Sequence, residues 1–74
     1  MKAIKEKADE LVEQYVKLLS KSYQYPKKVT CIQCAITSVK DTIEVLKQAY
    51  PNDYDHFDFY SQQTELLTEL ESRL

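Results

Sequence analysis

The sequence predicts an all-α protein, a small three-helix bundle that forms a single domain over residues 1–74. Hydrophobic residues recur at steps of three and four along three stretches, which is the spacing of one helical face. Two prolines, Pro26 and Pro51, separate these stretches. The chain contains no glycine, the residue that suits tight β-hairpin turns and phosphate-binding loops, so both of those features are disfavoured.

The first helix is expected over residues 2–22. Acidic residues occupy its early part and Lys17 and Lys21 lie near its end, an order that suits the helix dipole. Its predicted buried stripe consists of Ile4, Ala8, Leu11, Tyr15, Leu18 and Ser22, widened by Val12 and Leu19.

The second helix is expected over residues 31–50. Thr30 and Gln33 have the spacing of a capping box, and Val29 with Cys34 would form the hydrophobic staple that accompanies it. Pro51 is expected to end the helix near Tyr50. The predicted stripe is Ile32, Ala35, Ile36, Val39, Ile43, Leu46 and Ala49.

The third helix is expected over residues 54–73, with Asn52 or Asp53 as its N-cap. Short connectors between three helices allow either an antiparallel bundle or a helical hairpin with the remaining helix across it. The predicted stripe is Phe59, Tyr60, Gln63, Leu66, Leu67, Leu70 and Leu74.

Charge is unevenly distributed along the chain. Five lysines and no acid lie between residues 14 and 40, whereas six acids and one arginine follow residue 51. Such polarity is typical of a directed electrostatic surface, although it also fits solvated helix faces that pair across the bundle.

Cys31 and Cys34 form a C-x-x-C at a helix start, where a thiol pKa is lowered and redox chemistry is favoured. A thioredoxin-like site would need a preceding strand, and zinc would need four ligands, whereas His56 is the one further soft ligand. We therefore expect Cys34 to be a small core residue and expect no metal, cofactor or catalytic residue, with redox chemistry and a metal shared between chains as alternatives. His56 is expected on a helix surface.

The segment from residue 50 to residue 60 mixes five aromatic residues with three aspartates. One helical face cannot bury all five rings, so some of them are expected at an interface. The alternative is an aromatic lid over a small core, and both descriptions can hold together. The predicted partner-binding residues are Tyr50, Asp53, Tyr54, Asp55, Phe57 and Asp58.

A second, basic patch combines lysines with aromatic residues, a pattern that can bind nucleic acid by phosphate contact and stacking. The signal is weak and arginine is missing from it, so loop solvation is preferred over direct binding of nucleic acid. Its residues are Lys21, Tyr23, Tyr25, Lys27 and Lys28.

The chain has no signal-peptide pattern and no apolar stretch of the ~20 residues that a membrane span needs. We therefore expect a soluble protein that acts in the cytoplasm without membrane partners.

Two stretches, KEKADELVEQY (Lys5–Tyr15) and QCAITSVKDTIEVL (Gln33–Leu46), resemble a group of short uncharacterised helical proteins from phages and prophages, many from Bacteroidetes. The group ends in an aromatic pair and an amphipathic helix, to which Phe59-Tyr60 and the following leucines are similar. Cys31 and Lys40-Asp41 depart from its pattern. The resemblance carries over no functional residues; it implies a host-takeover or counter-defence setting, such as that of anti-CRISPR inhibitors.

These observations predict a non-enzymatic protein-interaction module that inhibits or modulates a host bacterial protein, such as a CRISPR effector nuclease. Two alternatives remain at this stage. One is a structural homodimer or assembly component that buries the aromatic residues against a second copy. The other is a weak RNA- or DNA-binding accessory protein that uses the basic patch.

Overall fold

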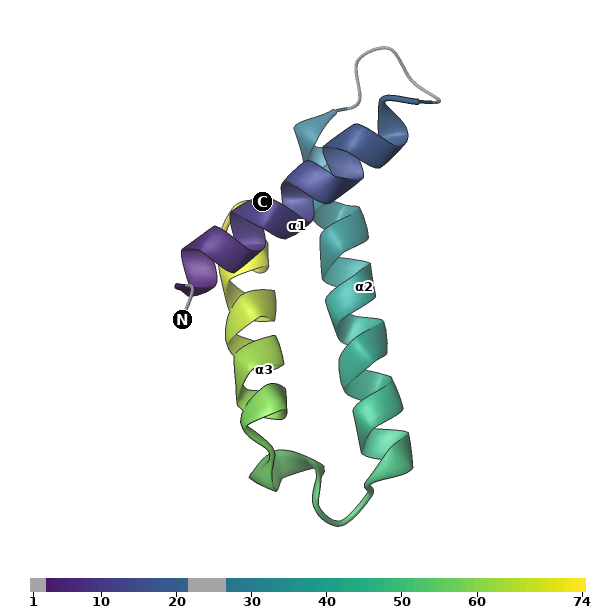
Figure 1. Ribbon diagram of the computed structural model, residues 1–74, viewed down its shortest axis with the longest axis vertical. Coiled ribbons are helices and arrows are strands. Elements are labelled where there is room, and N and C mark those ends of the chain that lie inside the picture. The colour runs from purple at the N-terminus through teal and green to yellow at the C-terminus, as the bar shows by residue number, and fades with distance from the viewer. Residues whose placement is uncertain (1–2, 22–26) are drawn as a thin grey trace.

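A computed structural model describes residues 3–21 and 27–74 of the chain (Figure 1). It contains the α-helices α1 (Ile4–Leu19), α2 (Lys28–Ala49) and α3 (Asp58–Glu71), and a single 3₁₀ turn, η1 (Tyr54–His56), between α2 and α3. No strand is present in these described ranges. The prediction of a small all-α protein with three helices is confirmed.

The helices form a hairpin with a third helix across it, which is the second of the two expected arrangements. α2 and α3 run antiparallel, and α1 crosses them obliquely near the start of α2 and the end of α3 (Figure 1). The 16 residues of α1 span about 24 Å, whereas the 22 residues of α2 span about 33 Å. α1 therefore leaves the other end of the hairpin, where α2 connects to α3, uncovered.

The core follows the predicted stripes closely. Its buried members are Ala8, Val12, Cys31, Ile32, Ala35, Ile36, Val39, Ile43, Leu66 and Leu70. All of them except Cys31 belong to the hydrophobic stripes read from the sequence. The expectation that Cys34 is the core cysteine is wrong, because Cys31 is fully buried and Cys34 is only half-buried.

The molecule is elongated for its length. It measures 44 × 24 × 20 Å, with a Cα radius of gyration of 13.4 Å. A compact domain of this size would have a radius of gyration of about 11 Å. An elongated shape exposes more surface per residue, so several apolar side chains, including Leu18 of the predicted first stripe, Phe59 and Leu74, lie exposed.

The predicted start of α2 is wrong by three residues. The helix begins at Lys28, with Lys27 as an N-cap residue that makes no side-chain capping bond, and the carbonyl of Lys27 accepts a 3.2 Å bond from the Cys31 amide. Thr30 is therefore inside the helix, no capping box forms, and Val29 is exposed. Cys31 lies one turn before Ala35 on the buried face and is itself fully buried. The helix ends at Ala49, as Pro51 predicted.

The third helix also begins later than predicted. Residues 54–56 form the 3₁₀ turn, the extended backbone of Phe57 follows, and α3 runs from Asp58 to Glu71 rather than over residues 54–73. Neither Asn52 nor Asp53 caps α3; Phe57 holds the N-cap position without a side-chain bond. Ring contacts made by the aromatic residues on both sides of this turn, described below, hold the chain in this path.

The first helix is shorter than predicted. α1 ends at Leu19, Ser20 donates its backbone N–H to the Val16 carbonyl at 2.9 Å, and the turn continues through Lys21. The predicted last residue, Ser22, lies outside the described residues.

Arg73 ties the C-terminal end of α3 to α1. Its guanidinium donates hydrogen bonds to the Asp9 carboxylate, to the Lys5 carbonyl at 3.3 Å and to Glu69 Oε1 at 3.4 Å. The hydrogen bond to Asp9, reinforced by the charges of Asp9 and Glu69, raises the pKa of Arg73 above its ordinary value, although burial opposes the shift. The contact fixes the position of α1 on the hairpin.

Candidate functional site

The exposed pair of rings at the end of the hairpin comes from two different elements. Tyr50 follows the last residue of α2 and Phe57 precedes α3, and their ring centroids lie 5.0 Å apart in an edge-to-face arrangement. Tyr50 is 50% exposed and Phe57 is 39% exposed. Each ring stabilises the orientation of the other, while part of each ring remains exposed to solvent. Aromatic residues of this kind are common at protein-interaction sites.

The three predicted aspartates lie exposed beside these rings. Asp53 and Asp55 belong to the turn between the helices, and Asp58 opens α3, where the helix dipole favours an anion. The Asp55 carboxylate lies 3.9 Å from His56 Nε2, and both side chains face solvent. The segment therefore presents an acidic border around an aromatic surface.

Tyr54, by contrast, is only partly exposed. Its ring packs edge-to-face on Tyr60 at 5.1 Å, and the Lys47 ammonium lies 5.6 Å from the centroid of the Tyr54 ring. Tyr54 and Tyr60 are half-buried. The aromatic residues of this segment therefore differ: Tyr50 and Phe57 are surface rings, whereas Tyr54 packs on Tyr60, which in turn contacts the core.

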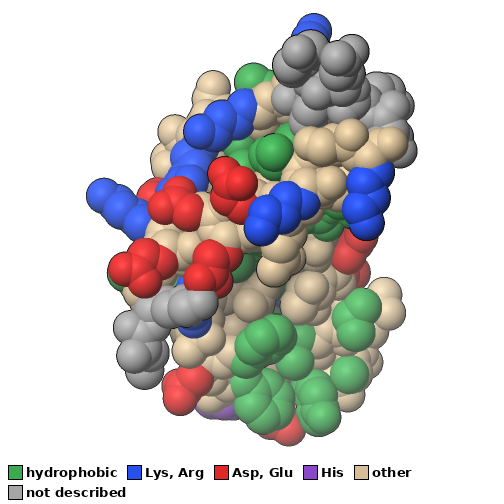
Figure 2. Space-filling view, turned by 45° about the horizontal axis from the view of Figure 1, so that its top comes forward, with side chains coloured by type: hydrophobic (Ala, Val, Ile, Leu, Met, Phe, Trp, Pro, Cys, Tyr) green, Lys and Arg blue, Asp and Glu red, His purple; other side chains and the backbone are tan. Residues whose placement is uncertain are grey.

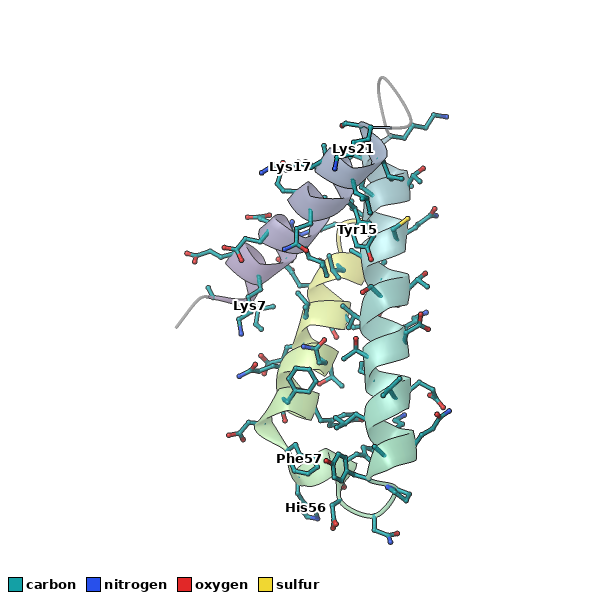
Figure 3. The ribbon with its side chains drawn as sticks, turned by 45° about the vertical axis from the view of Figure 1, so that its right-hand side comes forward. Lys7, Tyr15, Lys17, Lys21, His56 and Phe57 are labelled. Atoms are coloured by element: carbon teal, nitrogen blue, oxygen red, sulfur yellow. The ribbon has the colours of Figure 1, made fainter. Side chains whose placement is uncertain are left out.

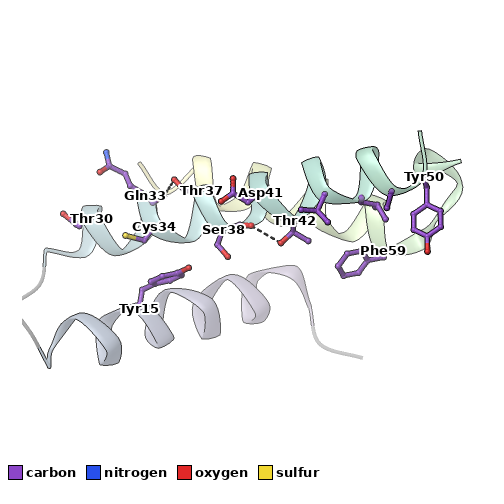
Figure 4. A pocket seen from close by; sticks show the side chains of 13 residues that line it. Tyr15, Thr30, Gln33, Cys34, Thr37, Ser38, Asp41, Thr42, Tyr50 and Phe59 are labelled. Atoms are coloured by element: carbon purple, nitrogen blue, oxygen red, sulfur yellow. Dashed lines mark hydrogen bonds between the residues drawn. The ribbon is translucent and has the colours of Figure 1, made fainter. Parts of the chain in front are cut away.

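A groove runs along α2 on the side that α1 and α3 leave open (Figure 4). Tyr15 of α1 borders it at one end and Phe59 of α3 at the other. Its volume is about 830 Å³. The residues that line it are Tyr15, Thr30, Gln33, Cys34, Thr37, Ser38, Asp41, Thr42, Val45, Leu46, Ala49, Tyr50 and Phe59.

One end of the groove is apolar. Val45 is 64% exposed and Phe59 is 47% exposed, and Leu46, Ala49 and Tyr50 continue the lining. Figure 2 shows hydrophobic side chains gathered on this end of the molecule, where α2 connects to α3. Since Tyr50 also touches Phe57, the apolar end of the groove and the exposed ring pair form one surface. We call this surface, Val45, Leu46, Ala49, Tyr50, Phe57 and Phe59, the apolar surface.

The middle of the groove is floored by small hydroxyl residues and one carboxylate. Thr37 donates its hydroxyl to the Gln33 carbonyl at 3.1 Å, and Thr42 donates to the Ser38 carbonyl at 3.0 Å. These donors are satisfied within their own helix, so they do not need a partner. Among the described residues that line the groove, Asp41 alone carries a charge at neutral pH, and it forms no ion pair with another described residue.

Sequence reasoning found the ring pair and its acidic border but missed the groove. Val45, Asp41 and Phe59 were not predicted as site residues. The available signal was the spacing of Cys34, Ser38, Asp41 and Val45, a second helical face opposite the buried stripe. That face becomes a groove only because α1 crosses the hairpin and stops short, which the pattern of one helix cannot indicate.

The basic patch lies at the opposite end of the molecule. Lys21, Lys27 and Lys28 are exposed there, whereas Tyr23 and Tyr25 lie outside the described residues. Lys17 and Lys21 mark the end of α1 that is far from His56 and Phe57 (Figure 3). Lys21, Lys27 and Lys28 therefore lie at the opposite end of the molecule from Asp53, Asp55 and Asp58.

The cysteines and the histidine do not gather. Cys31 is fully buried and Cys34 lines the groove near the start of α2, whereas His56 is exposed in η1, a 3₁₀ turn rather than an α-helix. Within residues 3–21 and 27–74, no group of three His, Cys, Asp or Glu side chains is placed to hold a metal ion. The exposed position predicted for His56 is confirmed.

None of the helices in the described ranges is both long and apolar enough to cross a membrane. Comparisons of the chain with protein-family models, with curated proteins and with solved structures found no match. The function must therefore be argued from the surface of the molecule itself.

Proposed function

We propose that this chain is a non-catalytic protein-binding module that inhibits or modulates its partner by covering part of the partner's surface. The observation that carries the proposal is the apolar surface. Tyr50, Phe57 and Phe59 are large rings left exposed by a chain with a thin core, and Val45 extends them. Exposed apolar patches with a polar border are typical of protein-interaction sites.

The acidic border indicates the charge expected on the partner's surface. Asp53, Asp55 and Asp58 place exposed negative charge in the same segment as Tyr50 and Phe57, so a partner with a basic surface would associate faster and more selectively. A protein that handles nucleic acid offers such a surface. The resemblance to phage proteins adds the hypothesis that the partner is a host bacterial protein such as a CRISPR effector nuclease, and this hypothesis rests on the resemblance alone.

The test is affinity capture from a bacterial lysate with three immobilised chains: the wild type, the Tyr50→Ser, Phe57→Ser double variant, and Leu18→Ser as a matched control. Leu18 is 58% exposed and lies on α1, outside the apolar surface. We expect mass spectrometry to find one protein retained by the wild type and by the control and lost from the double variant. Equal retention by all three chains would exclude this surface.

The charges can be tested on the captured protein. Changing Asp53, Asp55 and Asp58 together to Asn should weaken binding and flatten its dependence on salt, because three charges leave the interface border. Measuring the affinity of the wild type and of the triple variant at two salt concentrations tests this expectation. An unchanged salt dependence would mean that the acidic border plays no part in binding.

A further inference from the structure

The groove along α2 has the dimensions of a helix-binding site. Its lining on α2 extends from Thr30 to Ala49, which is a length of about 29 Å at 1.5 Å per residue. Small side chains, namely those of Cys34, Ser38 and Thr42, form the floor, so another helix axis can approach closely. Because the hydroxyls of Thr37 and Thr42 bond within α2, a docked helix would not have to satisfy these two donors.

The polarity of the lining residues changes along this length. Val45, Leu46, Ala49 and Phe59 make one end apolar, and Asp41 introduces one negative charge near the middle. A helix that carries hydrophobic residues at helical spacing could lay them on the apolar end. A lysine or arginine one to two turns away on the same face would reach Asp41, since its aliphatic stem can lie on apolar surface while its charged head meets the carboxylate.

Two other occupants conflict with Asp41. A second copy of the chain related by two-fold symmetry would bring Asp41 close to its own symmetry mate, because Asp41 lies near the midpoint of the Thr30–Ala49 lining. Like charges that meet in an interface cost several kcal/mol, on the order of a thousandfold in affinity. A nucleic-acid strand would bring its phosphates to the same carboxylate.

We propose that the α2 groove binds an amphipathic α-helix of a partner protein, with hydrophobic anchors on the apolar end and a lysine or arginine facing Asp41. The proposal rests on protein binding as the function and specifies the recognised element. In this proposal Asp41 and the acidic border have different roles. Asp41 selects the register of the docked helix, whereas the aspartates of the turn attract the partner as a whole.

A displayed library of helix-forming peptides about 20 residues long, the length of the groove lining, provides the test. The library is selected in parallel against the wild type, against Asp41→Lys and against Val45→Asp. We expect peptides enriched on the wild type to share hydrophobic anchors and one fixed Lys or Arg position. We expect Asp or Glu at that position on Asp41→Lys, and loss of enrichment on Val45→Asp.

Affinities of one enriched peptide then measure the contribution of the carboxylate. Asp41→Asn should weaken binding of that peptide roughly tenfold, the scale of one partly buried charge pair. The matched control Glu44→Gln removes an exposed carboxylate of α2 that does not line the groove and should leave the affinity unchanged. Equal losses for both variants, no enrichment on the wild type, or the same preferred charge on Asp41→Lys would each overturn the proposal.

Sedimentation of the wild type tests the competing occupant. A dimer that Val45→Asp dissociates would show that a second copy fills the groove, and would overturn the proposal. The outcomes also separate this inference from the proposed function. A captured partner that depends on Tyr50 and Phe57, together with a failed peptide selection, would leave the function standing and remove the helix-binding groove.

Discussion

At the scale of single residues, exposure and contact divide similar side chains into different roles. Tyr50 and Tyr54 lie four positions apart, yet Tyr50 keeps half of its surface free and Tyr54 packs on Tyr60 beneath the Lys47 ammonium. Cys31 and Cys34 divide in the same way, one into the core and one into the groove. Residue type alone does not assign these roles; the neighbouring element does.

Arg73 joins the end of α3 to α1, so removal of its side chain should lower the stability of the fold. Arg73→Ala is expected to lower the free energy of unfolding by about 0.5–1 kcal/mol, a value kept small because Asp9 is exposed, and to lower the Tm by roughly 2–6 °C. Thermal unfolding followed by circular dichroism measures the effect, with Lys40→Ala as the control for loss of an exposed positive charge. A melting curve identical to that of the wild type would mean that the contact with Asp9 does not hold α1 in place.

The effect of Arg73 has a defined pH dependence. Its pKa is raised in the folded chain, so the stabilisation is complete below the ordinary arginine value and is lost only as the pH rises through the raised value. The guanidinium itself therefore contributes no pH dependence between roughly pH 6 and pH 9. Melting curves of the wild type and of Arg73→Ala should keep the same separation across that interval.

At the scale of elements, packing decided the helix boundaries against local signals. The caps at Thr30 and Asp53 are chemically sound, yet α2 starts three residues earlier than predicted and α3 starts after Phe57. α2 has Lys27 and Lys28 at its N-terminal end, although the dipole disfavours positive charge there. The element that results is longer than its local signals predict and has a weak N-terminus.

This weak N-terminus can be repaired by one substitution. Lys27 already has the extended backbone of an N-cap residue, with φ −70° and ψ 135°. Lys27→Asp should therefore stabilise the protein by about 1 kcal/mol, because its carboxylate can accept a backbone N–H of the first turn and suits the dipole. Chemical denaturation measures the gain, and Lys40→Asp, in the middle of α2, should show none. A Lys27→Asp protein no more stable than the wild type would mean that α2 does not begin where the structure places it.

The sequence predicted the buried faces well and the site only in part. The repeat of three and four identified every core residue except Cys31, because the period of an α-helix is a local property of the chain. The exposed rings Tyr50 and Phe57 were predicted from crowding within one segment. The groove was not, because Val45 of α2 and Phe59 of α3 line one groove only once these two helices pair. The hydrophobic pattern of a single helix does not indicate contacts of this kind between helices.

At the scale of the whole molecule, the crossing of α1 leaves one end of the hairpin uncovered. α1 covers the half of the hairpin where α2 begins, and the other half exposes the apolar surface with its acidic border. Lys21, Lys27 and Lys28 lie at the covered end, whereas Asp53, Asp55 and Asp58 lie at the uncovered end together with Lys47. Under the proposed function, the chain binds its partner at this uncovered end of the hairpin.

Hydrogen exchange of the chain, free and bound to the captured protein, tests that claim most directly. We expect backbone amides of residues 45–60, which include the end of α2 and η1, to exchange more slowly in the complex. The amide of Lys21, which lies beyond the end of α1 and outside the groove lining, should be unaffected. Slower exchange confined to the lysine end, with residues 45–60 unchanged, would contradict the account.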